Sequence, residues 1–125
     1  MAEDKEIFFI IDTSFYSRIH FALSLASSYS SLGHSVRIMF GYEGIKRLKK
    51  GIIDHIEEGA EIGFQKLTKI SETLEGIRKL GGKIYVCPTA MALHNLTRDD
   101  LIDGIDNVMG IVEFTIQAGY KIIYI

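Results

Sequence analysis

The residue best suited to covalent sulfur chemistry is the single cysteine of the chain, Cys87. It precedes Pro88, which cannot donate to a strand ladder and is favoured in the first turn of a helix. We therefore expect Cys87 at or near a helix N-cap, where free backbone N–H groups and the helix dipole favour a thiolate. A thiolate is the nucleophilic form of a cysteine side chain, and its reactions require no metal or organic cofactor.

A second interpretation of Cys87 stays open at this stage. Free cysteine is often a small buried hydrophobe with no chemical role. A lone cysteine also excludes an intramolecular disulfide framework and a cysteine-rich zinc site. The four histidines show no metal-ligand spacing, so no metal is assigned. Among them His94 would be a base for Cys87 if the short helix folded back, and is otherwise an exposed side chain.

Other candidate site residues follow predicted strands. They are expected to bind substrate or line a pocket beside the thiol: Asp12, Thr13, Ser14, Gly41, Tyr42, Pro88, Thr89 and Met91. Each also has an ordinary interpretation. Residues 12–14 are typical helix caps, residues 41 and 42 are turn residues, and Met91 packs one turn beyond the cysteine. The basic run at 46, 47, 49 and 50 is either a solvated face or a surface that docks an acidic partner or attracts thiosulfate.

The elements that position these residues alternate along the chain. Short apolar runs rich in β-branched and aromatic residues predict strands at 6–11, 35–40, 83–87 and 121–125. Helical spacing predicts helices at 15–32, 43–50, 64–80, 89–95, 97–105 and 107–118. Residues 52–63 are predicted to form a short helix and a loop. A Thr97–Asp100 pair resembles a capping box.

This alternation predicts a three-layer α/β fold with a mostly parallel sheet and helices on both faces. Ligands of such folds bind outside the carboxyl ends of the strands. Cys87, Asp12 and Gly41 are all predicted at that edge. The strand order does not follow from the sequence pattern.

Length and charge indicate how many domains the chain forms and which classes of partner are excluded. The chain has 125 residues, which predicts one domain over 1–125, and 47% hydrophobic residues, which allow a large core. A net charge of −2 argues against nonspecific electrostatic binding to nucleic acid. No apolar run is long enough to span a membrane. The charged start and the lone cysteine indicate a reducing cytoplasm.

The residues resemble a known family over most of the chain. The stretch 83–91 (KIYVCPTAM), then 96–104 (LTRDDLIDG), Gly110, Ala118 and a closing strand are similar to the DsrE/DsrF-like family, most closely its peroxiredoxin-like DsrE branch. The N-terminal half, with an apolar strand, an Ala/Ser-rich helix and VRIMF at 36–40, is similar too. The weakest part is residues 51–63. No single one of these motifs is specific to the family. The combination of the motifs in this order is.

The resemblance implies a flavodoxin-like (DsrE/F-like) fold and a cytoplasmic sulfur-trafficking protein. Such proteins carry sulfur on the matching cysteine as a persulfide or thiosulfonate. They pass it to a partner such as a TusA-like sulfur carrier protein, and they form trimers or hexamers. Here only Cys87 can take that role. Where relatives often have Ser shortly after the cysteine, this chain has Thr89 and Ala90, and it lacks the second cysteine of some relatives.

Three other classes of function stay open beside sulfur transfer. One is a non-catalytic small-anion or nucleotide binding module of the same fold, and another is an oligomeric scaffold with an inert cysteine. The third is peroxidase activity, which the peroxiredoxin-like branch implies and which would need an external resolving thiol.

Overall fold

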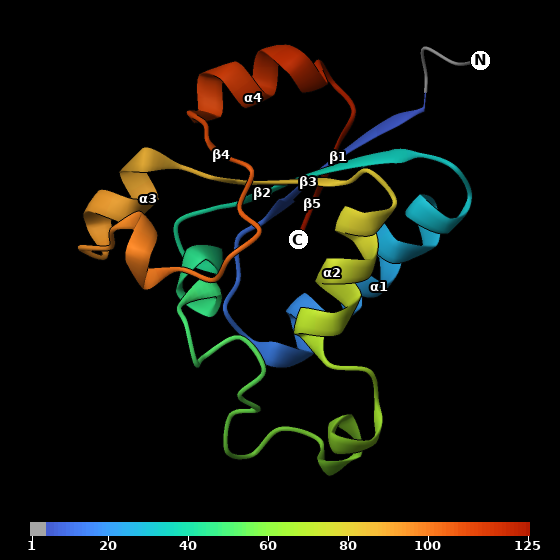
Figure 1. The fold of residues 1–125 in the computed structure, drawn as a ribbon, viewed down its shortest axis with the longest axis vertical. Coiled ribbons are helices and arrows are strands. Elements are labelled where there is room, and N and C mark those ends of the chain that lie inside the picture. The colour runs from blue at the N-terminus through green and yellow to red at the C-terminus, as the bar shows by residue number, and fades with distance from the viewer. Residues whose placement is uncertain (1–4) are drawn as a thin grey trace.

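A single parallel sheet organises the computed structural model, which describes residues 5–125 (Figure 1). Its strand order is β4-β3-β2-β1-β5, and neighbouring strands of the sheet pair in parallel. The strands are β1 (Glu6–Ile11), β2 (Ser35–Phe40), β3 (Lys83–Val86), β4 (Asn107–Val108) and β5 (Ile122–Tyr124). The predicted parallel α/β fold with helices on both faces is confirmed.

Helices cover the two faces of the sheet unequally (Figure 1). The helices α1 (Tyr16–Ser31) and α2 (Ile70–Lys79) pack against each other on one face. The helix α4 (Ile111–Ala118) covers the other face. Successive side chains of a strand point to opposite faces, and the ring of Phe9 contacts Tyr29 of α1 whereas that of Phe8 contacts Phe114 of α4.

The remaining connections are short helical turns. The helix α3 (Pro88–Leu93) directly follows β3. Among residues 5–125 the other short helices are the 3₁₀ helices η2 (Gly44–Leu48), η3 (Ile62–Lys66) and η4 (Arg98–Asp100). No helix among residues 5–125 is long and apolar enough to cross a membrane.

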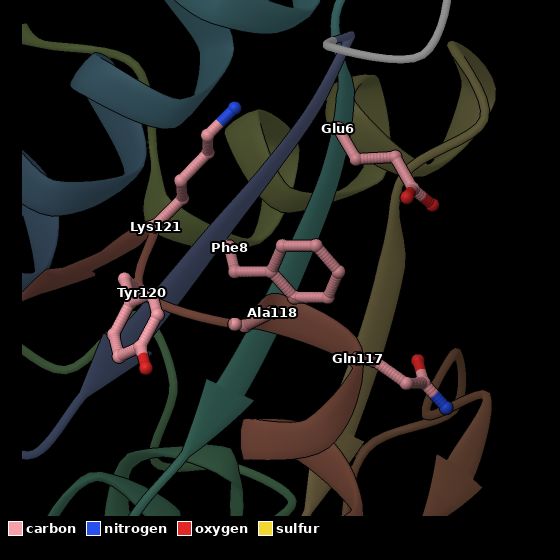
Figure 2. A pocket seen from close by; sticks show the side chains of 7 residues that line it. Glu6, Phe8, Gln117, Ala118, Tyr120 and Lys121 are labelled. Carbon is pink, nitrogen blue, oxygen red and sulfur yellow. The ribbon is translucent and has the colours of Figure 1, made fainter.

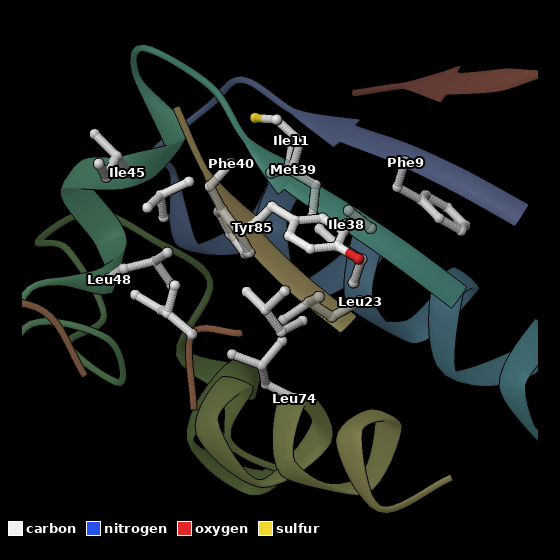
Figure 3. Packing of buried hydrophobic residues seen from close by; sticks show 14 of the residues in the cluster. Phe9, Ile11, Leu23, Ile38, Met39, Phe40, Ile45, Leu48, Leu74 and Tyr85 are labelled. Carbon is white, nitrogen blue, oxygen red and sulfur yellow. The ribbon is translucent and has the colours of Figure 1, made fainter. Parts of the chain in front are cut away.

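The core lies between the central strands and the α1–α2 layer (Figure 3). Side chains from β1, β2 and η2 are completely buried there: Phe9, Ile11, Ile38, Phe40, Ile45 and Leu48. Burying an apolar side chain of this size contributes about 1.5–3 kcal/mol. The apolar central strands therefore hold the sheet and fix where their carboxyl ends lie.

The helix predicted at 64–80 is shorter in the structure and begins only at Ile70. Residues Leu67 and Lys69 are extended. The Asp54 carboxylate accepts hydrogen bonds from the Ser71 N–H and hydroxyl, so it caps the helix from a distant loop. Residues 52–61 form turns rather than the predicted short helix, and the helix predicted at 43–50 is the 3₁₀ helix η2.

The predicted helices at 97–105 and 107–118 are also partly wrong. The Thr97–Asp100 capping box is present, but it opens only the 3₁₀ turn η4. Residues Asn107–Val108 form β4, because Asp106 binds the edge of β3: its N–H donates to Ile84 O at 2.8 Å, and its carboxylate accepts the Ile84 N–H at 2.7 Å. The helix α4 starts after this strand, at Ile111.

Candidate functional site

Cys87 follows the last residue of β3 and is the N-cap residue of α3. Its carbonyl accepts the Met91 N–H at 3.1 Å, which closes the first turn of the helix. Pro88 occupies that first turn and has no N–H, so Thr89 and Ala90 carry the N–H groups that helix geometry leaves without intrahelical partners. The cysteine is only 2% exposed. The predicted strand–cysteine–helix arrangement is therefore present, with the thiol covered.

The sheet register identifies the neighbours of Cys87. Phe40 pairs with Val86 and Val86 pairs with Val108, so continuing the register places Cys87 between Gly41 and Met109. The Met109 N–H donates to Val86 O at 2.9 Å, which carries the β3–β4 pairing to this point. On the other side of β2, the Gly41 N–H donates to Ile11 O at 2.9 Å. Asp12, Gly41, Cys87 and Met109 thus form one row across the carboxyl edge.

The connections change faces of the sheet at the strand that ends in Cys87. The helix that follows β2 is α2, on one face, whereas the helix that follows β4 is α4, on the other. In the sheet β3 lies between β2 and β4. In α/β proteins, ligands bind outside the carboxyl ends of the strands where the connections change faces. The topology therefore gives Cys87 the position typical of a functional residue.

Asp12 extends over Gly41 in the row. A Cβ placed on Gly41 would lie 2.8 Å from Asp12 Oδ1, so the absence of a side chain there leaves room for the carboxylate. The same oxygen accepts the Glu43 N–H at 2.9 Å. Oδ2 accepts the Tyr124 hydroxyl at 3.2 Å, and the nearby carboxylate raises the pKa of Tyr124. Asp12 thus ties together the ends of β2, β1 and β5.

The predicted caps of α1 do not cap it. The Thr13 hydroxyl accepts the Phe15 N–H at 3.2 Å, and the N-cap residue Phe15 has no side-chain cap. Instead, the Glu57 carboxylate accepts the Tyr16 N–H at 2.7 Å. A carboxylate from a distant loop thus satisfies the positive end of α1. The sequence pattern misses Glu57 because its partner is 41 positions away.

Arg47 is a second residue that the sequence analysis does not single out. It is 5% exposed and donates to three backbone carbonyls, those of Ser14, Ile52 and His55. Its guanidinium also donates to Glu57 Oε2 at 2.9 Å. Predicted as part of a solvated basic run, Arg47 instead anchors the 51–61 segment. No local signal separates Arg47 from the adjacent Lys46, because its burial depends on carbonyls that come from other segments.

The other predicted site residues lie along α3 and the turn after β2. Pro88 and Thr89 are exposed, Met91 is partly buried against the core, and Tyr42 is exposed. His94 is the C-cap of α3, and its Nε2 lies 2.6 Å from the Tyr42 carbonyl. This imidazole is therefore bound at the opposite end of α3 from Cys87, and the predicted alternative that it acts as a base for the thiol is not supported.

A separate hollow lies at the amino ends of β1 and β5 (Figure 2). It has a volume of about 280 Å³, and its walls include Glu6, Phe8, Gln117, Tyr120 and Lys121. It lies at the end of the strands opposite to Cys87 and holds no thiol. Within residues 5–125 no cluster of three or more His, Cys, Asp or Glu side chains is arranged to hold a metal ion.

Solved structures of the same fold come from bacteria and archaea. The protein of unknown function MTH1491 from Methanobacterium thermoautotrophicum is 20% identical, with a TM-score of 0.69 over 98% of this chain and 100% of that one. The YchN protein of E. coli is 15% identical, with a TM-score of 0.63 over 96% and 99%. BT1422 of Bacteroides thetaiotaomicron, a conserved protein of unknown function, is 16% identical, with a TM-score of 0.64 over 100% and 98%.

At these identities the likeness shows a shared fold. No curated protein matches the chain significantly. The model of the DsrE/DsrF-like family matches residues 5–125, nearly the whole sequence. The chain therefore belongs to the DsrE/DsrF-like family.

Proposed function

We propose that this protein is a sulfur carrier, with sulfurtransferase chemistry, that holds sulfane sulfur on Cys87 and passes it to a partner thiol. The observation that carries the proposal is the placement of the only thiol at the end of β3, where the connections change faces, and at the start of α3. Membership of the DsrE/DsrF-like family supports it.

The transfer moves one sulfur atom without net oxidation or reduction. The Cys87 thiolate attacks the outer sulfur of a donor persulfide R–S–SH, the new S–S bond forms, and R–S⁻ leaves. Cys87 then carries –S–SH. In the second step an acceptor thiolate attacks that outer sulfur, and the Cys87 thiolate leaves. The N–H groups of Thr89 and Ala90, which have no intrahelical partner at the start of α3, are the groups we expect to bind the anionic terminal sulfur.

The burial of Cys87 sets a condition on this chemistry. Because Cys87 is only 2% exposed, a sulfur donor can reach its thiol only if the residues packed over it move. On one side the thiol adjoins α3, a helix of only six residues. The outer surface of this helix, including Pro88 and Thr89, is exposed. Short helices with few buried contacts open at low free-energy cost. We therefore expect loading in the native state, at a rate limited by movement of α3.

Mass spectrometry of the intact protein tests the proposal. Native protein is exposed to polysulfide, thiosulfate or tetrathionate, with Cys87→Ser as the control. We expect a sulfur adduct on the wild-type chain that a small thiol removes. If Cys87 reacts only after unfolding, the proposal fails and the alternative of an oligomeric scaffold with an inert cysteine takes its place. The burial of Cys87 is the observation that favours this alternative.

The alternative of a small-anion or nucleotide binding module finds less support. Phosphate-binding α/β proteins commonly use the N-terminus of the helix after the first strand. Here the Glu57 carboxylate already accepts the Tyr16 N–H there. The Asp12 carboxylate lies over Gly41 at the same edge. The Tyr16 N–H is therefore already occupied, and the Asp12 carboxylate would repel a phosphate at this edge.

We also propose a homo-oligomer, a trimer or hexamer as the family resemblance implies, with a TusA-like protein as the partner that exchanges sulfur. The outward face of α4 supports self-association through a second copy of this chain. Val112 and Ile116, one turn apart, are 73% and 75% exposed, and Tyr120 is fully exposed just beyond them. A contiguous exposed apolar stripe of this kind is typical of a protein interface.

A further inference from the structure

The Asp12 carboxylate lies close to Cys87 in the row at the carboxyl edge of the sheet. The register places Gly41 directly beside Cys87, and side-chain positions paired in this way point to the same face from strands about 4.8 Å apart. Asp12 Oδ1 lies 2.8 Å from the position that a Cβ of Gly41 would occupy. The two steps together place this oxygen within about 8 Å of the Cys87 Cβ atom. The carboxylate thus fills the place of the side chain that Gly41 lacks, next to the cysteine.

The negative charge of Asp12 has no cationic partner among residues 5–125. Its two oxygens accept the Glu43 N–H at 2.9 Å and the Tyr124 hydroxyl at 3.2 Å, which are neutral donors. None of the ion pairs in this part of the chain involves Asp12. Of the lysines that follow on this edge, Lys46 pairs with the Glu43 carboxylate at 2.6 Å, and the charge of an aspartate in η4 acts on Lys49. The charge of Asp12 is therefore not neutralised by an ion pair.

The neighbours of Cys87 from the adjoining strands are otherwise uncharged. The register places Met109 on the β4 side of Cys87, and Met39 lies on the same face one pair earlier on β2. Both methionines are buried. The cations that β2 and β3 carry on this face, Arg37 and Lys83, each lie four residues before the row, about 13 Å along their strands. An anion at the thiol is therefore nearer to the Asp12 carboxylate than to either cation of these strands.

Persulfide and sulfonate donors would leave different charges on Cys87. A hydropersulfide R–S–SH gives –S–SH, which can hold its proton and stay neutral. With tetrathionate the thiolate attacks an inner sulfur, a new S–S bond forms, and thiosulfate leaves with the electron pair of the broken bond. Cys87 then carries –S–S–SO₃⁻, whose sulfonate is ionised at neutral pH. Only the second adduct places a fixed anion beside Asp12.

We infer that Asp12 is a specificity-determining residue, which favours neutral persulfide donors of Cys87 and disfavours donors that carry a sulfonate. The inference rests on the sulfur-carrier proposal and names its substrate class. Two like unit charges about 8 Å apart, at an effective dielectric constant of about 40, repel enough to slow an anion roughly fivefold. The free N–H groups of Thr89 and Ala90 offset this only in part, because they are two neutral donors whereas a sulfonate presents three oxygens.

The rates of two reagents that differ in charge test the inference without a sulfur donor. Native protein is treated with neutral 2-hydroxyethyl methanethiosulfonate or anionic 2-sulfonatoethyl methanethiosulfonate, and the modification of Cys87 is followed by intact mass. Relative to the small neutral thiol N-acetylcysteinamide, we expect the neutral reagent to be favoured roughly fivefold, and less as salt rises. Asp12→Asn keeps the shape of the side chain and an acceptor for the Glu43 N–H, and it should abolish this preference.

Two control variants separate the charge of Asp12 from its structural contacts. Asp103→Asn removes an exposed carboxylate beside Leu74 of α2 and should leave the ratio of the two rates unchanged. Tyr124→Phe removes a neutral partner of Asp12 and retains its charge, so it should also leave the ratio unchanged. A purely structural role of Asp12 would change both rates by the same factor, and this result would overturn the inference.

Loading with sulfur then tests the substrate class. Relative to the same small thiol, the hydropersulfide of 2-mercaptoethanol should load the wild type well and tetrathionate poorly, and Asp12→Asn should gain loading from tetrathionate. An unchanged ratio in Asp12→Asn, or equal loading of the wild type by both donors, would refute the selectivity and leave the sulfur-carrier proposal standing. A chain that prefers the neutral reagent but loads from neither donor would refute the sulfur-carrier proposal alone. A native Cys87 that no reagent or donor modifies would refute both.

Discussion

At the scale of single residues, Cys87 and Arg47 have contrasting roles. Cys87 makes no side-chain cap hydrogen bond and lies covered at the end of β3. Arg47 is also buried, but its guanidinium donates to three carbonyls and one carboxylate. A buried charge persists only when such partners compensate its desolvation. The Arg47 guanidinium is therefore committed to the fold, whereas the Cys87 side chain is a buried, uncharged group.

Replacing Arg47 should therefore destabilise the protein. We expect Arg47→Met to lower the free energy of unfolding by about 2–3 kcal/mol, because the carbonyls of Ser14, Ile52 and His55 lose a charged donor. Urea unfolding measures it. The matched control is Lys46→Met, which removes an exposed pair with Glu43 and should cost under about 0.5 kcal/mol. Equal losses in the two variants would contradict the anchoring role of Arg47.

The partner of Arg47 predicts a dependence of stability on pH. Burial acts to raise the pKa of Glu57, but hydrogen bonds from the Tyr16 N–H and from Arg47 outweigh it and lower the pKa below the ordinary value of 4.5. The stabilisation from Glu57 is therefore present above the ordinary value and is lost as pH falls through the lowered one. The melting-temperature gap between wild type and Glu57→Gln should close as the pH is lowered through this window. A gap that stays constant with pH would contradict the assignment.

At the scale of elements, η2 packs closely against the end of β1. A Cβ on Gly44 would fall on the backbone oxygen of Ile11, too close for any real contact. We expect Gly44→Ala to cost about 1–3 kcal/mol, as overpacking does. Gly63→Ala in η3 is the control, since a Cβ there meets nothing within 4 Å. Thermal unfolding of both variants tests this, and a neutral Gly44→Ala would show that η2 can move away from β1.

The elements also show where sequence reasoning succeeds and where it stops. The strands β1, β2 and β3 were predictable because parallel strands buried on both faces are near-continuous apolar runs. The two-residue strand β4 was not, because it depends on Asp106 binding the backbone of Ile84. The starts of α1 and α2 depend on Glu57 and Asp54, which come from a segment distant in sequence.

The candidate site also has features that the sequence predicts and features that only the structure shows. The position of Cys87 between a strand and a helix follows from local rules about proline and β-branched residues. Its neighbours Gly41 and Met109 follow only from the strand order, which the sequence pattern does not contain. Its burial depends on packing across the whole edge of the sheet.

At the scale of the whole molecule, the two faces of the sheet differ in cover. The helices α1 and α2 share one face, whereas α4 covers the other with an apolar stripe on its outer side. If that stripe joins copies of this chain, Ile116→Asp should shift the protein to monomers in light scattering after gel filtration. The control is Gln117→Asp, the adjacent exposed polar position on the same helix. A monomeric wild type would refute the proposed assembly.

The central claim is that Cys87 carries sulfur that a second thiol can take. The most direct measurement is transfer from the loaded, purified protein to a separate acceptor thiol, with both masses followed over time. The account predicts that the adduct leaves Cys87 as one sulfur atom appears on the acceptor, and that Cys87→Ser transfers nothing. An adduct that never moves to the acceptor, or a native Cys87 that never loads, would contradict it.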